Sequence, residues 1–334
     1  MSDHVVTVAM SDHVVTVAMS DHVVPVAMSG GNTLDPAGSE AGTIAGVWWI
    51  LFAIAAFVAV VVIAAIVVGM LGRRRAQPLR PNRFVGTFGV AAPAVLLLVA
   101  AVVTIVSTDA LRSADDEALA VDVIGRQFWW EVRYPDHGVV TANEIHVPQG
   151  VPIDLRLTSD DVIHSLWVPR LAGKVDMIPG QENHLRFEAT ETGTFWGACA
   201  EFCGVQHAFM HFHVVVEPAA DFQAWIAART APAAELESPL ARRGRDVFAA
   251  NACAGCHSVA TRSSDDSDVN DAGPPLGDLG ARQHLAAGVI ENTPDNLAAW
   301  IADPDAFKPG SKMPAVELSA DELDAIVAYL ESLP

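Results

Sequence analysis

Two long runs of apolar residues dominate the first third of the chain. Residues 41–72 carry no charged side chain, and residues 84–108 carry none either. A helix needs roughly 20 predominantly apolar residues to cross a bilayer, and both runs exceed that length. The pattern therefore predicts a multidomain membrane protein with a two-helix transmembrane hairpin over residues 44–108.

The connection between the two runs is basic, with five arginines: Arg73, Arg74, Arg75, Arg80 and Arg83. Short basic loops stay on the cytoplasmic side of a membrane. We therefore expect both termini, and everything after residue 108, on the outer face.

After the second run the pattern changes to short β-rich segments. QFWWEVRY, VPIDLRLTS and HFHVVVEP alternate apolar with polar positions or concentrate β-branched residues, and Gly and Pro separate such segments. Many short runs with turn signals predict a β-sandwich or a small barrel. We assign residues 109–230 to an all-β domain and residues 231–238 to a linker.

Residues 239–334 follow a helical pattern. Thr293 precedes Pro294 as a helix cap, and Ser319 with Glu322 has the spacing of a capping box. The last segment then places four apolar residues on one helical face, namely Ala325, Ile326, Tyr329 and Leu330. This part is predicted to be an all-α domain.

Residues 1–43 contain a nine-residue repeat, in the copies MSDHVVTVA, MSDHVVTVA and MSDHVVPVA. Solenoid repeats are longer and fill whole domains. We therefore expect this stretch to be a disordered tail without a fold of its own.

Charge divides the chain in the same way. Residues 1–108 are neutral overall, residues 109–238 carry eight basic against twenty acidic groups, and residues 239–334 carry seven against fifteen. An acidic surface repels a phosphate backbone, which excludes nucleic acid as a partner. The same surface attracts a basic partner protein.

The motif CAGCH, with Cys253, Cys256 and His257, has the spacing of c-type haem attachment. Two thiols bond the haem, and the neighbouring His coordinates its iron from one face. A CxxC pair alone also suits zinc or a redox disulfide. The adjacent His, and the absence of a second CxxC pair, favour haem c.

Two residues of the C-terminal domain compete for the other face of the iron. Met313 lies in KPGSKMPA, a Gly- and Pro-containing segment between two predicted helices, and His284 is the alternative. A loop can bring a thioether over the haem, and Met ligation raises the reduction potential, which suits electron transfer. We favour Met313 and expect His284 at the surface.

A second cluster of ligand-type residues occupies residues 197–213, GACAEFCGVQHAFMHFH. Outside the cell a disulfide is the default state of two nearby cysteines. However, thiolate, imidazole and thioether together form a ligand set that copper prefers. Two cysteines in one loop also allow two thiolates to bridge two copper ions, and the β-rich domain around them resembles a cupredoxin.

These segments resemble subunit II of haem–copper cytochrome c oxidase, in the caa3-type form that is fused to a C-terminal class I cytochrome c domain. CAEFCGVQHAFM is similar to the copper A loop of that family, and DVIHSLWVP is similar to its upstream histidine segment. The hairpin, the cupredoxin-like domain and the haem domain follow the order of the family. The resemblance covers residues 44–334 and leaves the repeated tail outside.

The resemblance implies six copper A ligands: His164, Cys199, Glu201, Cys203, His207 and Met210. The cysteines would bridge the two ions, each of the two histidines would bind one, and Met210 and the Glu201 carbonyl would be axial ligands. The Glu201 side chain would reach a magnesium or manganese ion at the contact with subunit I. His211 and His213 would be surface or supporting residues.

The aromatic segment QFWW departs from the QWxW pattern of the family, where electrons arrive from a soluble cytochrome c. Phe128 stands where the first Trp is expected. Trp129 or Trp130 would then take over this role, or the entry point would lie elsewhere, unless these rings serve only in packing.

The resemblance implies a function as well. The chain would be the electron-transfer subunit of a proton-translocating terminal oxidase in a bacterial plasma membrane, and it would not itself reduce oxygen. Its partners would be subunits I and III, the bilayer, and a cytochrome c or bc1-type complex as donor. The alternative is a membrane-anchored c-type cytochrome whose cupredoxin-like domain holds no copper.

Overall fold

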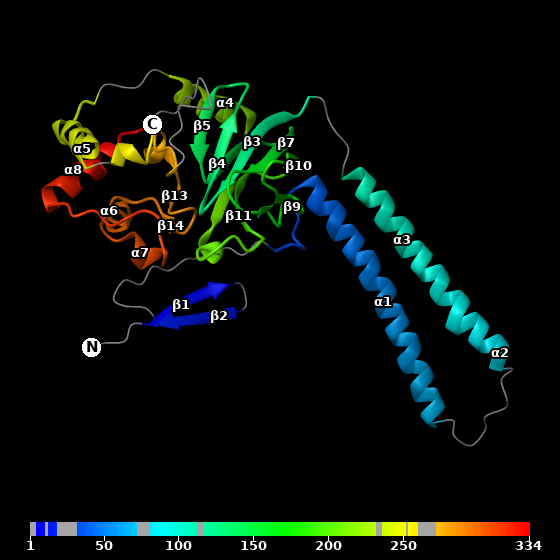
Figure 1. Ribbon diagram of the computed structural model, residues 1–334. Helices are drawn as coiled ribbons and strands as arrows, with labels where there is room; N and C mark the ends of the chain where they lie inside the picture. Colours follow the sequence, from blue (N-terminus) through cyan, green and yellow to red (C-terminus); the bar gives the residue numbers. More distant parts are fainter. Residues whose placement is uncertain are drawn as a thin grey trace.

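The computed structural model describes residues 5–10, 13–18, 32–71, 81–111, 117–231, 236–251, 253–259 and 272–334. Within these ranges the chain forms a pair of long helices, a two-sheet β-sandwich and a smaller helical domain, in that order (Figure 1). The long helices extend away from one side of the sandwich, and the helical domain lies on the other side. The predicted fold class is confirmed.

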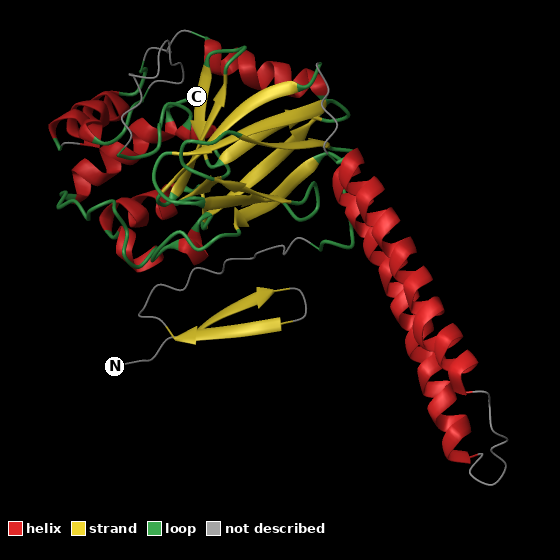
Figure 2. Cartoon of the chain, turned by 45° about the vertical axis from the view of Figure 1, so that its right-hand side comes forward, coloured by secondary structure: helices red, strands yellow, loops and turns green. Residues whose placement is uncertain are grey.

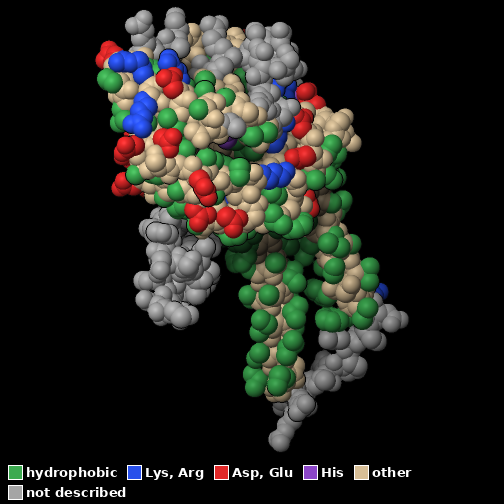
Figure 3. Space-filling model, turned by 60° about the vertical axis from the view of Figure 1, so that its left-hand side comes forward, with side chains coloured by type: hydrophobic (Ala, Val, Ile, Leu, Met, Phe, Trp, Pro, Cys, Tyr) green, Lys and Arg blue, Asp and Glu red, His purple; other side chains and the backbone are tan. Residues whose placement is uncertain are grey.

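The apolar runs form the helical pair. The first span is α1 (Ser39–Leu71); the second combines α2 (Pro81–Phe84), a π-helical stretch (Val85–Ala91) and α3 (Ala92–Ala110). Both spans are long and apolar enough to cross a membrane. Apolar side chains cover the visible face of both helices (Figure 3), as expected for a surface that contacts lipid.

The start of α1 is attached to the sandwich and precedes the predicted start of the hairpin at residue 44. The backbone N–H of Ala37 donates to the carbonyl of Arg170 at 2.7 Å, and that of Ala41 donates to the carbonyl of Leu171 at 3.2 Å. A Cβ at Gly38 would collide with the same Leu171 carbonyl. Only glycine allows this close approach, which joins the first helix to the sandwich.

Part of the repeated tail is paired rather than irregular. Strand β1 (Val5–Met10) pairs antiparallel with β2 (His13–Ala18), so two copies of the repeat form a hairpin. The repeat is rich in valine, and β-branched residues favour strands. Most other residues of the tail before position 32, and residues 232–235 of the predicted linker, lie outside the described residues.

The sandwich consists of two five-stranded sheets, with strand orders β10-β7-β3-β4-β5 and β6-β12-β11-β8-β9 (Figure 2). The first sheet contains β3 (Leu119–Arg126), β4 (Trp129–Tyr134), β5 (Val139–Ala142), β7 (Pro152–Ser159) and β10 (Asn183–Glu188). The second contains β6 (Glu144–Pro148), β8 (His164–Trp167), β9 (Lys174–Met177), β11 (Gly193–Cys199) and β12 (His211–Glu217). The β3–β7 and β6–β12 pairs are parallel.

Strand β7 shows how the sequence pattern builds the core. Ile153, Leu155 and Leu157 point inward and are buried, while the residues between them are partly exposed. This period of two is the pattern of a strand with one buried face. Helix α4 (Ala219–Thr230) closes part of the sandwich by packing Trp225 edge-to-face against Tyr134, with 5.1 Å between ring centroids.

The C-terminal domain is built around two helices. Helix α5 (Pro239–Ala250) packs on α8 (Ala320–Glu331) so closely that a Cβ at Gly244 would collide with the carbonyl of Ala325. Between them lie α6 (Pro294–Ala302), α7 (Pro304–Phe307), short 3-10 turns at Cys253–Gly255 and Leu279–Ala281, and a ribbon of β13 (His284–Leu285) and β14 (Ile290–Glu291). Thr293 caps α6, and the capping box of Ser319 and Glu322 precedes α8, as predicted.

Buried polar contacts join the C-terminal domain to the sandwich. Glu144, at the start of β6, accepts hydrogen bonds from the backbone N–H groups of Gln283 at 2.8 Å and His284 at 2.9 Å. The His284 ring stacks on His213 of β12, with centroids 3.8 Å apart. His284 is therefore half-buried at the domain boundary instead of lying on the open surface as expected, and His213 is buried.

A second contact centres on the buried carboxylate of Asp278. Thr141 of β5 donates to it at 2.6 Å, and Arg229 of α4 and Arg282 pair with it at 3.4 and 2.5 Å. The cluster thus spans the boundary between the two domains. Removing one partner of a buried ionic pair costs about 3–5 kcal/mol, so each group of this cluster depends on the docked arrangement of the two domains.

Acidification is expected to weaken the contact between His213 and His284 at the domain boundary. Burial, with His284 adding to it, lowers the pKa of His213 from 6.5 to about 4. The folded protein keeps the ring neutral, whereas the unfolded chain protonates it, so the free energy of unfolding falls as the pH drops from 6.5 towards 4. We expect a loss of up to about 3 kcal/mol from this group.

Urea denaturation at neutral and at acidic pH measures the effect. His213→Gln should reduce the loss on acidification, and His137→Gln, in the turn between β4 and β5, serves as the control. Equal losses in the parent and the His213→Gln protein would contradict the expectation.

Candidate metal and haem centres

The second sheet brings the predicted copper ligands to one end of the sandwich. His164 begins β8, and Cys199 ends the neighbouring strand β11, where it pairs with Leu166 of β8. Cys203 and His207 lie in the loop after β11, and Met210 comes directly before β12. Backbone pairing therefore sets the distance between the upstream histidine and the loop.

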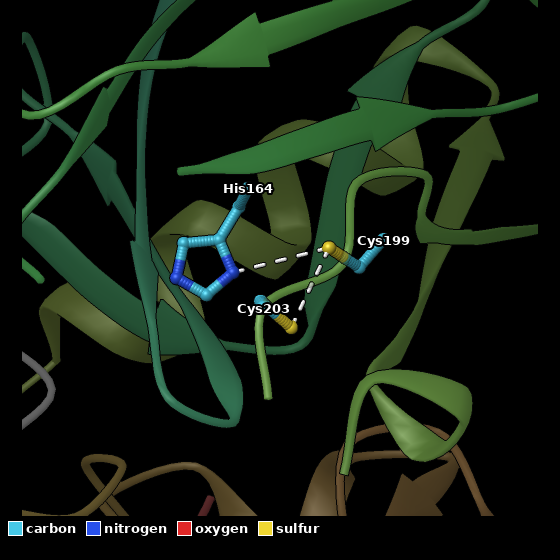
Figure 4. Close-up of side chains that lie close together, drawn as sticks. All are labelled: His164, Cys199 and Cys203. Atoms are coloured by element: carbon cyan, nitrogen blue, oxygen red, sulfur yellow. Dashed lines mark hydrogen bonds between the residues drawn. The ribbon is translucent and has the colours of Figure 1, made fainter. Parts of the chain in front are cut away.

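The six predicted residues form one cluster around the two sulfur atoms. Cys199 Sγ lies 3.8 Å from Cys203 Sγ, 3.9 Å from His164 Nδ1 and 3.1 Å from the Glu201 carbonyl. Cys203 Sγ lies 3.8 Å from His207 Nδ1 and 3.7 Å from Met210 Sδ. Figure 4 shows His164 and both cysteines pointing towards one another.

The two sulfurs are not bonded to each other. Both cysteines are free, and their separation of 3.8 Å is well beyond the roughly 2.05 Å of a disulfide. The sulfurs, imidazoles and thioether that converge here are a set of soft donors that suits copper. The geometry therefore fits a metal centre better than a disulfide loop.

The thiols are prepared for metal binding. The hydrogen bond from Cys203 holds the pKa of Cys199 well below its ordinary value. Burial acts in the opposite direction, and the contact with His164 lowers the pKa further. The pKa of Cys203 is raised in turn by Cys199 and by burial. The contact with Cys203 therefore favours the thiolate form of Cys199, and thiolate is the form that binds metals.

Asp161 and Gly125 orient His164, and we did not predict either from the sequence. Asp161 Oδ1 lies 2.8 Å from His164 Nε2, which leaves Nδ1 facing the sulfurs. A Cβ at Gly125 would lie 2.7 Å from His164 Cδ2, so glycine makes room for the ring. Burial alone would lower the pKa of His164, but the contacts with Asp161 and Cys199 outweigh it and raise the pKa.

A second centre is a cavity of about 340 Å³ in the C-terminal domain. Its walls carry all four predicted haem residues: Cys253, Cys256, His257 and Met313. Most of the remaining lining is apolar, with Leu276, Leu297, Ile326 and Leu330 among it. An apolar cavity with two thiols at its wall fits a covalently attached haem.

The imidazole of His257 is held for coordination. Its Nδ1 lies 2.8 Å from the carbonyl of Pro274, which makes Nδ1 the N–H donor and leaves Nε2 free as a ligand atom. Burial lowers the pKa of His257, so the ring remains neutral. A Cβ at Gly273 would lie 2.7 Å from the ring, so this position needs glycine.

The aromatic segment splits between the two domains. Phe128, in the turn before β4, and Trp129, the first residue of β4, line the haem cavity from the sandwich side. Trp130 instead lies in the sandwich core, with its ring centroid 5.9 Å from that of His164. Adjacent residues of a strand point to opposite faces, which explains why the two tryptophans serve different surroundings.

Comparison with known proteins gives a family match for each of the two domains that hold these residues. A family profile described as "Cytochrome C oxidase subunit II, periplasmic domain" matches residues 139–218, and a cytochrome c profile matches residues 241–334. Cytochrome c oxidase subunit 2 of Alkalihalophilus pseudofirmus is 35% identical over 315 residues, which cover 90% of each chain. The chain belongs to the cytochrome c oxidase subunit 2 family.

Other relatives carry the same name. Cytochrome c oxidase subunit 2 of Bacillus sp. (strain PS3) is 35% identical and covers 72% of each chain. A solved structure, the periplasmic domain of subunit II of cytochrome oxidase of Bradyrhizobium japonicum, is 33% identical, with a TM-score of 0.33; it covers 35% of this chain and 94% of that one.

Membership of the family settles the general function. The chain is subunit II of a haem–copper oxidase with a fused cytochrome c domain, and its role is electron transfer. Haem c and copper are its cofactors, and the other oxidase subunits are its expected partners. The alternative of a copper-free membrane-anchored cytochrome is less well supported, and the two apolar helices indicate membrane anchoring.

Removal of the Asp161 carboxylate should weaken metal binding. Asp161→Ala frees the His164 ring to rotate, and loss of such a supporting hydrogen bond typically costs 10–100-fold in metal affinity. Competition with a copper chelator measures the change. Asp160→Ala is the matched control, because the neighbouring Asp160 pairs with Arg126 at 2.6 Å and does not contact His164. Equal copper retention in both variants would contradict this role.

Proposed function

We propose that this subunit holds a dinuclear copper A centre and one haem c, and that it passes electrons from an external donor through the haem to the copper and on to subunit I. The copper residues are His164, Cys199, Cys203, His207, Met210 and the carbonyl of Glu201. The haem residues are Cys253 and Cys256 as thioether attachments, and His257 and Met313 as axial ligands.

The observation that carries this proposal is the pair of unbonded sulfurs of Cys199 and Cys203. Each sulfur has an imidazole nitrogen within 3.9 Å, and the Met210 thioether lies 3.7 Å from one of them. A single-copper site needs one thiolate, whereas two thiolates can be shared between two ions. When bound, such a pair supplies a redox centre that spreads one electron over two metals.

The protein around the cluster keeps the ligands in place. Cys199 and Cys203 are buried, and the Cys199 backbone N–H donates to the carbonyl of Met210 at 2.9 Å. This bond ties the two ends of the copper loop together. A rigid ligand set changes little between redox states, which favours rapid electron transfer.

The side chain of Glu201 has a different role in the proposal. Its carbonyl faces Cys199, while the residue as a whole is exposed. An exposed carboxylate beside the copper loop is available to a magnesium or manganese ion at the contact with subunit I. Carboxylate oxygens are the ligands that such hard ions prefer.

Electrons would cross between the domains at Phe128 and Trp129. Both line the haem cavity, and Trp130 continues inward to His164. The family has Trp where this chain has Phe128, at the point where a soluble cytochrome c delivers electrons. In this chain the fused haem domain would deliver them instead, which accounts for the different residue. An external donor, a cytochrome c or a bc1-type complex, would reduce the haem.

The membrane orientation follows from the arginine loop of residues 73–83. We propose that this loop is cytoplasmic and that the sandwich and the haem domain lie on the outer face of a bacterial plasma membrane, where covalent haem attachment takes place. Subunits I and III would contact the helical pair within the bilayer.

Metal analysis of the purified full-length subunit, produced in a host that matures c-type cytochromes, tests the proposal. We expect one haem and two coppers per chain, with a near-infrared mixed-valence copper band and a copper EPR signal split over two equivalent nuclei. A haem without copper, together with a Cys199–Cys203 disulfide, would contradict the copper centre.

Substitution of each candidate tests the sixth ligand of the haem iron. Met313→Leu should convert the haem to a form that binds external ligands such as imidazole, because the iron loses its thioether. His284→Gln removes an imidazole that stacks on His213 and should leave the haem spectrum unchanged. The opposite outcome would assign the ligand to His284.

A further inference from the structure

The chain contains three lysines, Lys174, Lys308 and Lys312, and one of them is buried between the two redox domains. Lys308 follows α7 and is 4% exposed. Lysine is almost never buried to this extent unless its amine is paired. Burial also lowers the pKa of Lys308 to about 7, so the fold retains this side chain at a cost in free energy.

Two hydrogen bonds join Lys308 to the sandwich. Its Nζ donates to the backbone carbonyl of Phe128 at 3.3 Å, and its own carbonyl accepts from Gln206 Nε2 at 3.0 Å. Gln206 is buried and directly precedes His207 in the copper loop. Lys308 therefore contacts both the aromatic segment and the loop that carries the copper ligands.

These contacts lie at the wall of the haem cavity. Lys308, Gln206 and Phe128 all line it, together with Met313, which follows Lys308 by five residues in the same loop. Figure 1 shows α7 and the β13–β14 ribbon beside the sandwich. The bonds of Lys308 thus join the loop of Met313 to the copper loop at the point where the two centres approach.

The nearby Lys312 also donates a hydrogen bond to the segment before β4. Its Nζ donates to Gln127 Oε1 at 3.2 Å, but Lys312 is exposed, so water can replace this bond. Among the residues that the structure describes, no carboxylate lies within ion-pair distance of Lys308. The amine of Lys308 therefore interacts with the Phe128 carbonyl and not with an acidic side chain.

We propose that Lys308 is a positioning residue for electron transfer between the haem domain and the copper domain, because it fixes the Met313 loop to Phe128 and Gln206. This inference rests on the proposed function. In the step concerned, the haem held by His257 would lose one electron, and the copper held by Cys199 and Cys203 would gain it. Lys308 does not exchange electrons. Its hydrogen bonds fix the distance between the Met313 loop and the copper loop.

The test uses the full-length subunit in its assembled oxidase, with three variants. Lys308→Met keeps the length of the side chain and removes the amine. Lys308→Arg keeps a cationic donor. Lys174→Met removes the same charge from β9, where Lys174 is exposed, and is the matched control. Haem and copper contents and spectra are recorded for each.

The decisive readout is the rate at which an electron, injected into the haem by a light-driven reductant, reaches the copper. We expect Lys308→Met to slow this transfer at least tenfold with unchanged haem and copper spectra, Lys308→Arg to recover part of the rate, and Lys174→Met to match the parent. Turnover with an external reduced cytochrome should fall in Lys308→Met while its KM stays the same, because Lys308 is buried between the two domains and out of reach of an external donor.

An unchanged transfer rate in a fully loaded Lys308→Met oxidase would overturn this inference and leave the proposed function intact. Equal slowing in Lys174→Met would also overturn it, because the loss of one positive charge anywhere on the protein would then explain the slower transfer. If Lys308→Met does not assemble, Gln206→Leu removes the bond to the Lys308 carbonyl, and an unchanged rate there would overturn the inference in the same way. A parent without copper would remove the proposed function itself.

Discussion

The approach of Cys199 to Cys203 at the end of the sandwich is the constraint on which the rest of the structure depends. Cys199 is fixed by strand pairing with β8, the strand that also begins with His164. The copper loop must then turn back within a few residues, which brings Cys203, and behind it Met210, onto the same point. A binding site whose ligands are held by sheet hydrogen bonds needs little rearrangement when electrons pass.

The second constraint is the contact between the two redox domains. A covalent tether alone would leave the haem domain free to move, and electron transfer falls steeply with distance. Here Glu144 and Asp278 provide buried polar contacts across the boundary, and the haem cavity takes part of its wall from Phe128 and Trp129. The fused domain therefore occupies the surface of the sandwich nearest to the copper loop.

Much of this arrangement could be predicted because the signals are local. Two uncharged runs, the CAGCH motif and the capping box at Ser319 each depend on spacing over a few residues, and the structure contains the corresponding elements. The copper ligands were harder, because residue spacing does not distinguish His164 from other upstream histidines. The resemblance to a family supplied that choice, and the structure brings His164 to the sulfurs.

The residues that could not be predicted act through three-dimensional contacts rather than through a sequence motif. Asp161 matters through the direction of the His164 ring, Lys308 through a carbonyl on another domain, and His284 through a stack with His213. The last two contacts form only when the domains are docked. The choice between Trp129 and Trp130 was also open, because β4 is buried on both faces and the usual alternation of polar and apolar positions is missing.

X-ray absorption at the copper edge of the purified subunit tests the central claim most directly, because it reports the atoms around each copper. A shared pair of thiolates predicts sulfur neighbours on every copper and a second copper at short range. A copper surrounded only by nitrogen and oxygen, without a neighbouring metal, would contradict the assignment of Cys199 and Cys203 as bridging ligands.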